Sequence, residues 1–144
     1  MDTANISFDI NTTDAEALLG IEVWIDDTCV YQNPHVTELH QFSHTMDDKD
    51  GDHELRVVMS GKTAEHTKID GQGNIIKDAL ISITNVRIDE IDVAPLFHRQ
   101  VEYHHDFNGT QEPVQDTFHT HMGCNGTLSL KFSTPIYLWL LENM

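Results

Sequence analysis

The sequence predicts an antiparallel β-sandwich, an all-β fold. Short segments in which apolar and polar residues alternate recur along the chain, and turn-forming residues separate them. No segment shows a sustained helical period, which excludes a helical bundle. We expect about eight to ten short strands in a jelly-roll-like arrangement. At 144 residues the chain fits one domain, residues 1–144.

The clearest strand follows an acidic turn at residues 47–52. Leu55, Val57 and Met59 fall at alternate positions and face one side of a sheet. Val58 faces the other side, so this strand is covered in part on both faces. We therefore expect it to be a central strand.

The remaining strands are predicted by the same alternation. They lie at residues 6–10, 21–25, 36–46, 80–88, 101–105, 118–122 and 127–132. A turn at Asp26-Asp27 predicts a hairpin between residues 21–25 and 29–31. A change of phase after Ile83 predicts a β-bulge near Asn85.

Two connections carry further signals. Residues 11–20 favour a short helical turn capped by Thr13 or Asp14. Residues 61–78 form a long polar connection of a length that is uncommon unless functional. Within it, Ile75-Ile76 predicts either a small anchor into the core or a short hairpin.

The final apolar run, residues 136–141, has apolar residues on both faces and is short for a helix. It predicts a strand buried on both sides. The alternative is a strand whose second face contacts another protein, with Tyr137, Trp139 and Leu141 as contact residues.

Charge narrows the range of partners. With 24 acidic and 8 basic residues, the formal net charge is -16. Nucleic acid and anionic membranes both require a basic surface, so we expect neither as a partner. Such a charge suits solubility, cation binding or contact with a basic protein.

Cysteine content and targeting signals add little. Cys29 and Cys124 could form one disulfide, but we expect two free, buried thiols. The N-terminus carries no signal peptide and no apolar run reaches the length of a membrane span. The sequence therefore predicts synthesis in a cytoplasm without standard export.

The acidic turn is a candidate calcium site. Asp48, Asp50 and Asp52 occur at alternate positions around Gly51, and calcium requires several oxygen ligands. The glutamate of an EF-hand loop is missing, because a strand begins instead. A solvated turn is the alternative.

Ten histidines form two groups, His104-His105 and His119-Thr120-His121. On a strand, His119 and His121 face the same side, which suits a transition metal. The alternative is that all four histidines are exposed or lie in an interface. Interface contacts of this kind weaken near pH 6.

No catalytic motif is present. The chain lacks a Gly-x-Ser-x-Gly motif, and its Gly-Lys-Thr lacks the upstream glycine of a phosphate loop. We therefore do not expect an enzyme. Aromatic residues on a sheet face could stack on sugars, although they more often serve as core or interface anchors.

Three segments resemble small virion structural proteins of tailed phages, particularly marine and cyanobacterial ones. They are residues 50–63 (DGDHELRVVMSGKT), 81–93 (ISITNVRIDEIDV) and 126–144 (GTLSLKFSTPIYLWLLENM). The resemblance implies an accessory protein of the virion that is made in the host cytoplasm. Such a protein docks on the capsid or tail through protein–protein contacts and forms a homo-oligomer in the particle.

The strand beginning Gly51-x-His53-x-Leu55-x-Val57 is also similar to that of calcium-dependent, xylan-binding carbohydrate-binding modules. This second resemblance implies a jelly-roll-like sandwich. It gives an alternative function, calcium-dependent attachment to host glycans, and does not transfer ligand residues.

Overall fold

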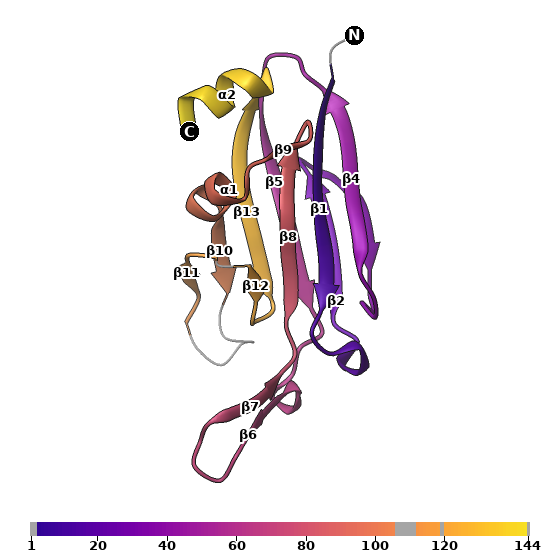
Figure 1. Cartoon of the computed structure of the whole chain (residues 1–144), viewed down its shortest axis with the longest axis vertical. Coiled ribbons are helices and arrows are strands. Elements are labelled where there is room, and N and C mark those ends of the chain that lie inside the picture. The colour runs from indigo at the N-terminus through magenta and orange to yellow at the C-terminus, as the bar shows by residue number, and fades with distance from the viewer. Residues whose placement is uncertain (1–2, 106–111, 119, 144) are drawn as a thin grey trace.

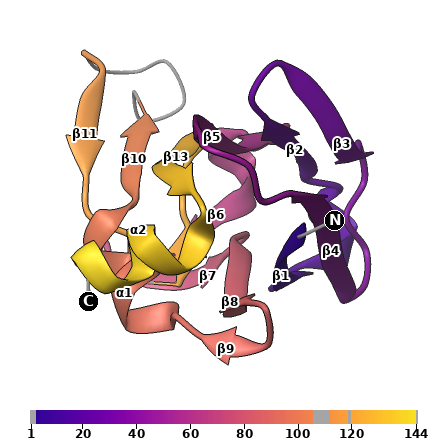
Figure 2. The same ribbon diagram turned by 90° about the horizontal axis from the view of Figure 1, so that it is seen from above.

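A computed structural model describes residues 3–105, 112–118 and 120–143. Two antiparallel sheets pack face to face, and a two-stranded hairpin projects from one end of them (Figures 1 and 2). This architecture confirms the predicted antiparallel β-sandwich. The described residues contain thirteen strands, more than expected, because several are only two or three residues long.

The first sheet has five strands. β1 (Thr3–Thr12) lies between β4 (His40–Asp47) and β8 (Ile81–Ile88), while β9 (Ile91–Asp92) and β12 (His121–Met122) pair with β8. The register between β1 and β8 changes where Ser7 pairs with Arg87 but Asp9 pairs with Thr84. This shift confirms the predicted bulge near Asn85, which has a positive φ of 54°.

The second sheet has six strands in the order β11-β10-β13-β5-β2-β3. Their bounds are β2 (Gly20–Ile25), β3 (Thr28–Asn33), β5 (Gly51–Ser60), β10 (Glu102–His105), β11 (Val114–Asp116) and β13 (Gly126–Thr134). Leu55 of β5 lies opposite Ile25 on one side and Leu130 on the other. β5 is therefore the central strand that its sequence predicts.

The core lies between the two sheets. Phe8 and Ile10 of the first sheet and Leu55, Met59 and Leu128 of the second are among its fully buried side chains. Full burial of a side chain of this size contributes about 1.5–3 kcal/mol. Alternation thus places one face of each strand in the core and leaves the opposite face available for other roles.

The expectation of a final strand is wrong, because residues 136–141 belong to the helix α2 (Ile136–Asn143). Ile136, Trp139 and Leu140 are buried, whereas Tyr137 and Leu138 are exposed. Buried positions at i, i+3 and i+4 are the mark of a helix packed on one face. The run is apolar at every position, so its sequence shows no contrast that distinguishes this period from that of a strand.

A second helix, α1 (Ala94–Gln100), was not predicted. It has Pro95 in its first turn and buries Leu96 and Phe97 against the sandwich. The predicted helical turn is present as the 3-10 turn η1 (Ala15–Ala17), in which the side chain of Asp14 accepts a hydrogen bond from the backbone of Glu16.

The long connection forms a second 3-10 turn, η2 (Ala64–His66), and the projecting hairpin β6 (Thr67–Ile69) and β7 (Ile75–Asp78). Ile75 and Ile76 are exposed. The hairpin alternative is therefore confirmed, and the core-anchor alternative is wrong.

Cys29 and Cys124 are not joined by a disulfide, and both are half-buried instead of buried. Among the helices of the described residues, none has the length and apolar character that crossing a membrane requires.

Candidate functional site

The outer face of the six-stranded sheet carries a row of polar and aromatic side chains. The cross-strand register places Trp24 of β2 opposite Arg56 of β5, and Arg56 opposite Ser129 of β13. These residues alternate with core positions, so they point away from the other sheet. Three neighbouring strands thus build one continuous surface.

Trp24 is held in place by two neighbours. Its indole Nε1 donates a hydrogen bond to Glu22 Oε1 at 3.0 Å. The guanidinium carbon of Arg56 lies 5.5 Å from the centroid of the indole ring, within range of a cation–π contact. The half-buried indole is therefore oriented before any ligand arrives.

Glu54 continues this surface toward the end of β5. Its Oε2 accepts a hydrogen bond from Ser129 Oγ at 2.6 Å, and its Oε1 lies 3.6 Å from Arg56 Nε. Both carboxylate oxygens are thus oriented by neighbouring strands. Because the Arg56 and Glu54 side chains are about one third exposed, this pair contributes little to stability and mainly sets geometry.

Asp26 lies beside Glu54, in the turn that joins β2 to β3. Its Oδ1 accepts a hydrogen bond from the Glu54 backbone at 2.9 Å, and its Oδ2 lies 2.8 Å from His53 Nδ1. Partial burial raises the pKa of Asp26, but the hydrogen bonds from His53 and Glu54 outweigh it and lower the pKa below its ordinary value. Asp26 is therefore ionised at neutral pH.

A broad cleft of about 500 Å³ lies where this surface meets α2. Its lining comprises Asp26, Asp52, His53, Glu54, Lys131, Phe132, Ser133 and Trp139. Carboxylates accept hydrogen bonds and the Lys131 ammonium donates them, so the lining can satisfy a ligand with several hydroxyl groups. The excess of carboxylates disfavours an anionic ligand.

The acidic turn is divided between different roles. Asp48 Oδ1 accepts a hydrogen bond from the backbone of Ile136 at 2.7 Å, at the start of α2. Asp52 lines the cleft, and Asp50 is exposed on the turn. Within the described part of the chain, no group of three or more His, Cys, Asp or Glu side chains is placed to hold a metal ion. Calcium binding at this turn stays a prediction.

The adjacent histidines of β10 point to opposite faces. His104 is exposed and its Nε2 lies 3.1 Å from Glu102 Oε2. His105 is buried, with its Nε2 2.7 Å from Asp116 Oδ2 and its ring against Tyr103. Of this pair, only His104 is presented to solvent.

The second histidine group cannot be placed as a pair. His119 lies outside the described residues, and His121 is exposed on β12, opposite Ser82 of β8. His121 therefore belongs to the five-stranded sheet and His104 to the six-stranded sheet. The transition-metal site stays a prediction.

The three predicted contact residues of the C-terminal run also separate. Tyr137 and Leu141 are exposed on α2, whereas Trp139 is only 7% exposed. The Trp139 ring packs edge-on against Phe132, with their centroids 6.3 Å apart. Trp139 is therefore a core residue that also lines the cleft.

Sequence reasoning missed the surface formed by Trp24, Arg56, Glu54 and Asp26. Alternation did place Trp24 on the outer face of its strand, which was the available signal. What joins it to Arg56 is the pairing of β2 with β5, and no local pattern specifies which strands are neighbours.

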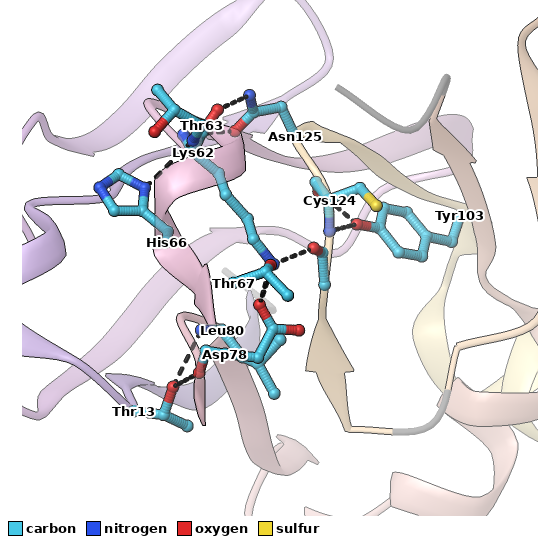
Figure 3. A network of polar contacts seen from close by, with 11 residues as sticks. Thr13, Lys62, Thr63, His66, Thr67, Asp78, Leu80, Tyr103, Cys124 and Asn125 are labelled. Carbon is cyan, nitrogen blue, oxygen red and sulfur yellow. Dashed lines mark hydrogen bonds and ion pairs between the residues drawn. The ribbon is translucent and has the colours of Figure 1, made fainter. Parts of the chain in front are cut away.

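A second polar network lies at the base of the projecting hairpin (Figure 3). Lys62 Nζ lies 2.6 Å from Asp78 Oδ1 and donates a hydrogen bond to the carbonyl of Gly123. The hydroxyl of Thr67 donates to the same Asp78 oxygen at 2.7 Å. The Asn125 side chain bonds both the backbone N–H and the carbonyl of Lys62. The hairpin is thus tied to the sandwich by a buried cation.

The segment that contacts Lys62 is held in turn by Tyr103. Its hydroxyl donates to the carbonyl of Cys124 and accepts from the Cys124 backbone N–H at 2.9 Å. Burial raises the pKa of Tyr103 above its ordinary value, so the phenol stays protonated. A donor is therefore always available for this carbonyl.

Sequence comparisons find no protein family and no curated relative that matches the chain. Among solved structures, the sandwich is similar to vCBM60 in its selenomethionine form, which is described in work on two families of calcium-dependent carbohydrate-binding modules. The TM-score is 0.55 at 12% identity, over 88% of this chain and 89% of that chain.

The sandwich is also similar to vCBM60 in complex with galactobiose. Here the TM-score is 0.50 at 12% identity, over 88% of this chain and 96% of that chain. At such low identity these likenesses show a shared fold and leave function to be argued from the site. The fold is that of a carbohydrate-binding-module-like antiparallel β-sandwich.

Proposed function

We propose that the chain is a non-catalytic glycan-binding module. Its ligand lies on the outer face of the six-stranded sheet, over Trp24 and into the adjoining cleft. The observation that carries the proposal is the prearranged Trp24–Arg56 pair next to the oriented carboxylates of Glu54 and Asp26. The likeness of the fold to carbohydrate-binding modules supports it.

The site suits a sugar for physical reasons. The apolar face of a pyranose ring stacks on an indole, while its hydroxyl groups donate to carboxylates and accept from an ammonium group such as that of Lys131. Because Trp24 and Glu54 are already held by neighbours, little side-chain entropy is lost on binding. The carboxylates lead us to expect neutral oligosaccharides and not sulfated ones.

Isothermal titration calorimetry tests the proposal with galactobiose, xylotriose and a sulfated heparin tetrasaccharide, each with calcium and with a chelator. We expect binding of a neutral sugar and none of the heparin fragment. Trp24→Ala and Lys131→Ala should each weaken affinity about tenfold or more, the loss of roughly 1.4 kcal/mol. Gln41→Ala, on the outer face of the other sheet, is the control and should bind as the wild type does.

Thermal unfolding of each variant separates loss of the site from loss of the fold. If Trp24→Ala and Lys131→Ala fold normally and bind unchanged, the sheet face is not the site. If the wild type binds no neutral glycan on a broad array, the glycan-binding proposal fails.

A second candidate function is that of an accessory structural protein of a tailed phage virion, acting by contact with capsid or tail proteins. Large apolar side chains exposed at both ends of the sandwich favour it, as does the resemblance of residues 50–63, 81–93 and 126–144. Mass spectrometry of gradient-purified particles of a phage that encodes the chain tests it. We expect the protein in the particles, and its absence there would reject this candidate.

A further inference from the structure

Two exposed apolar surfaces lie at opposite ends of the long axis of the molecule (Figure 1). One is the hairpin β6–β7, here named the arm, with Ile69, Ile75 and Ile76 exposed. The other is the outer side of α2, here named the apical patch, with Tyr137, Leu138 and Leu141 exposed. Clusters of exposed apolar residues of this kind mark interaction surfaces.

The arm has more apolar surface than an isolated hairpin needs. Ile69 and Ile75 are cross-strand partners, and Ile76 follows directly with 67% of its surface exposed. A two-stranded hairpin is marginally stable by itself, and here its isoleucines face solvent instead of a core. Their exposure is explained by a partner that covers them.

The arm is also held in one direction. Asp78, its last residue, is bound by the buried Lys62 and by Thr67 at the start of β6 (Figure 3). The hydroxyl of Thr13 donates to the carbonyl of Asp78 at 3.0 Å and accepts from the backbone of Leu80 at 2.9 Å. A contact surface presented on a rigid base loses less entropy on docking.

The charges of the two ends are opposite in character. The arm carries Lys68 and Lys77, which are cross-strand partners, in a chain with only eight basic residues. The carboxylate of Asp89 hydrogen-bonds Tyr137 of the apical patch, and Asp48 binds the first residue of α2. The apical patch is therefore bordered by acidic residues.

We propose that the arm of one copy docks on the apical patch of a second copy, head to tail. Arm-to-arm contact would bring Lys68 and Lys77 against the same lysines, and patch-to-patch contact would bring carboxylates together. Only the head-to-tail contact joins apolar surface to apolar surface with opposite charges around it. This inference does not rest on glycan binding.

A contact of this kind is heterologous, so each copy retains a free arm at one end and a free patch at the other. Copies add in series, either as an open chain or as a ring. Both surfaces are small, so we expect a weak contact that becomes populated at high local concentration.

Sedimentation velocity over a wide concentration range tests the proposal. The wild type should show an average mass that grows with concentration. Ile76→Asp and Leu141→Asp change exposed positions on the arm and the patch, and each variant alone should remain monomeric. An equimolar mixture of the two should form a species of about twice the monomer mass, because the mixture contains one intact patch and one intact arm.

Several results would overturn the proposal. A wild type that stays monomeric at millimolar concentration excludes the contact. If Leu141→Asp alone still associates, the arm binds another arm, and if Ile76→Asp alone does, the patch binds another patch. Circular dichroism must show both variants folded. Trp24→Ala should associate as the wild type does, and Ile76→Asp should keep any glycan binding, so the two proposals can fail separately.

Discussion

Lys62 and Asp78 form an ion pair with 2.6 Å between Nζ and Oδ1, and the Lys62 side chain is only 3% exposed. Asp78 retains 25% exposure, so solvent reaches one side of the pair. Removing the carboxylate would leave a charged ammonium in the protein interior, which is costly because desolvation is no longer offset.

We expect Asp78→Asn to lower the free energy of unfolding by about 3 kcal/mol, near the lower end of the range for buried pairs because of the partial exposure. Urea titration measures this. The double variant Lys62→Met/Asp78→Asn should be less destabilised than Asp78→Asn, since the unpaired charge is gone. A single variant as stable as the wild type would show that the pair is solvated.

The second prediction concerns acid stability. The pKa of Asp26 is lowered in the folded protein, so its carboxylate contributes stability that is fully present above its ordinary pKa of 3.8. This contribution is lost as the pH falls through the lower, folded-state pKa. Unfolding free energies measured from about pH 6 to pH 2.5 should therefore fall more steeply for the wild type than for Asp26→Asn. Parallel curves would contradict the lowered pKa.

Gly126 predicts a steric effect at the junction of β10 and β13. A Cβ atom there would clash with the His104 carbonyl and lie 2.9 Å from His105 Cβ. Gly126→Ala should cost roughly 1–3 kcal/mol, the usual range for overpacking. Gly71→Ala is the matched control, because no atom lies within 4 Å of its Cβ position. Equal melting temperatures for both variants would show that the strands separate without cost.

The two faces of α2 should respond differently to truncation. Trp139 is buried against Phe132, so Trp139→Ala should destabilise by about 3–5 kcal/mol. Leu141 is 77% exposed, and Leu141→Ala should change stability by no more than about 0.5 kcal/mol. Chemical denaturation compares the two. A large effect at Leu141 in dilute solution would place it in the core.

Asp48 allows a test of calcium at the acidic turn. Its bond to the Ile136 backbone satisfies one of the free N–H groups at the start of α2, so Asp48→Ala should cost about 1 kcal/mol. We expect this cost to be the same with calcium and with a chelator. Asp50→Ala, at an exposed position, should be neutral. A cost that appears only with calcium would instead support metal binding at the turn.

The strands of the sandwich could be predicted because their alternation has contrast. Leu55, Val57 and Met59 are buried as the period-two pattern requires, and even the bulge near Asn85 left a phase change that could be read. α2 could not be predicted in this way. Its positions are almost uniformly apolar, so the helical period emerges only when three of them pack against the sandwich.

The candidate site was less accessible to prediction. Asp52 was singled out and does line the cleft, but Asp48 caps a helix whose existence was not expected. Trp24 and Arg56 are 32 positions apart in the sequence and meet only because β2 pairs with β5. Cross-strand neighbours depend on sheet topology, which alternation within a single strand does not encode.

The central position of β5 also has a kinetic consequence. On one side β5 pairs with β13, so Gly51 lies opposite Thr134, the last residue of the last strand in the chain. Closing so long a loop costs entropy before any contact offsets it. During synthesis the six-stranded sheet cannot be completed until β13 emerges from the ribosome. We therefore expect folding on the millisecond-to-second timescale of non-local β topologies, with β5 lacking one of its two neighbours until the end.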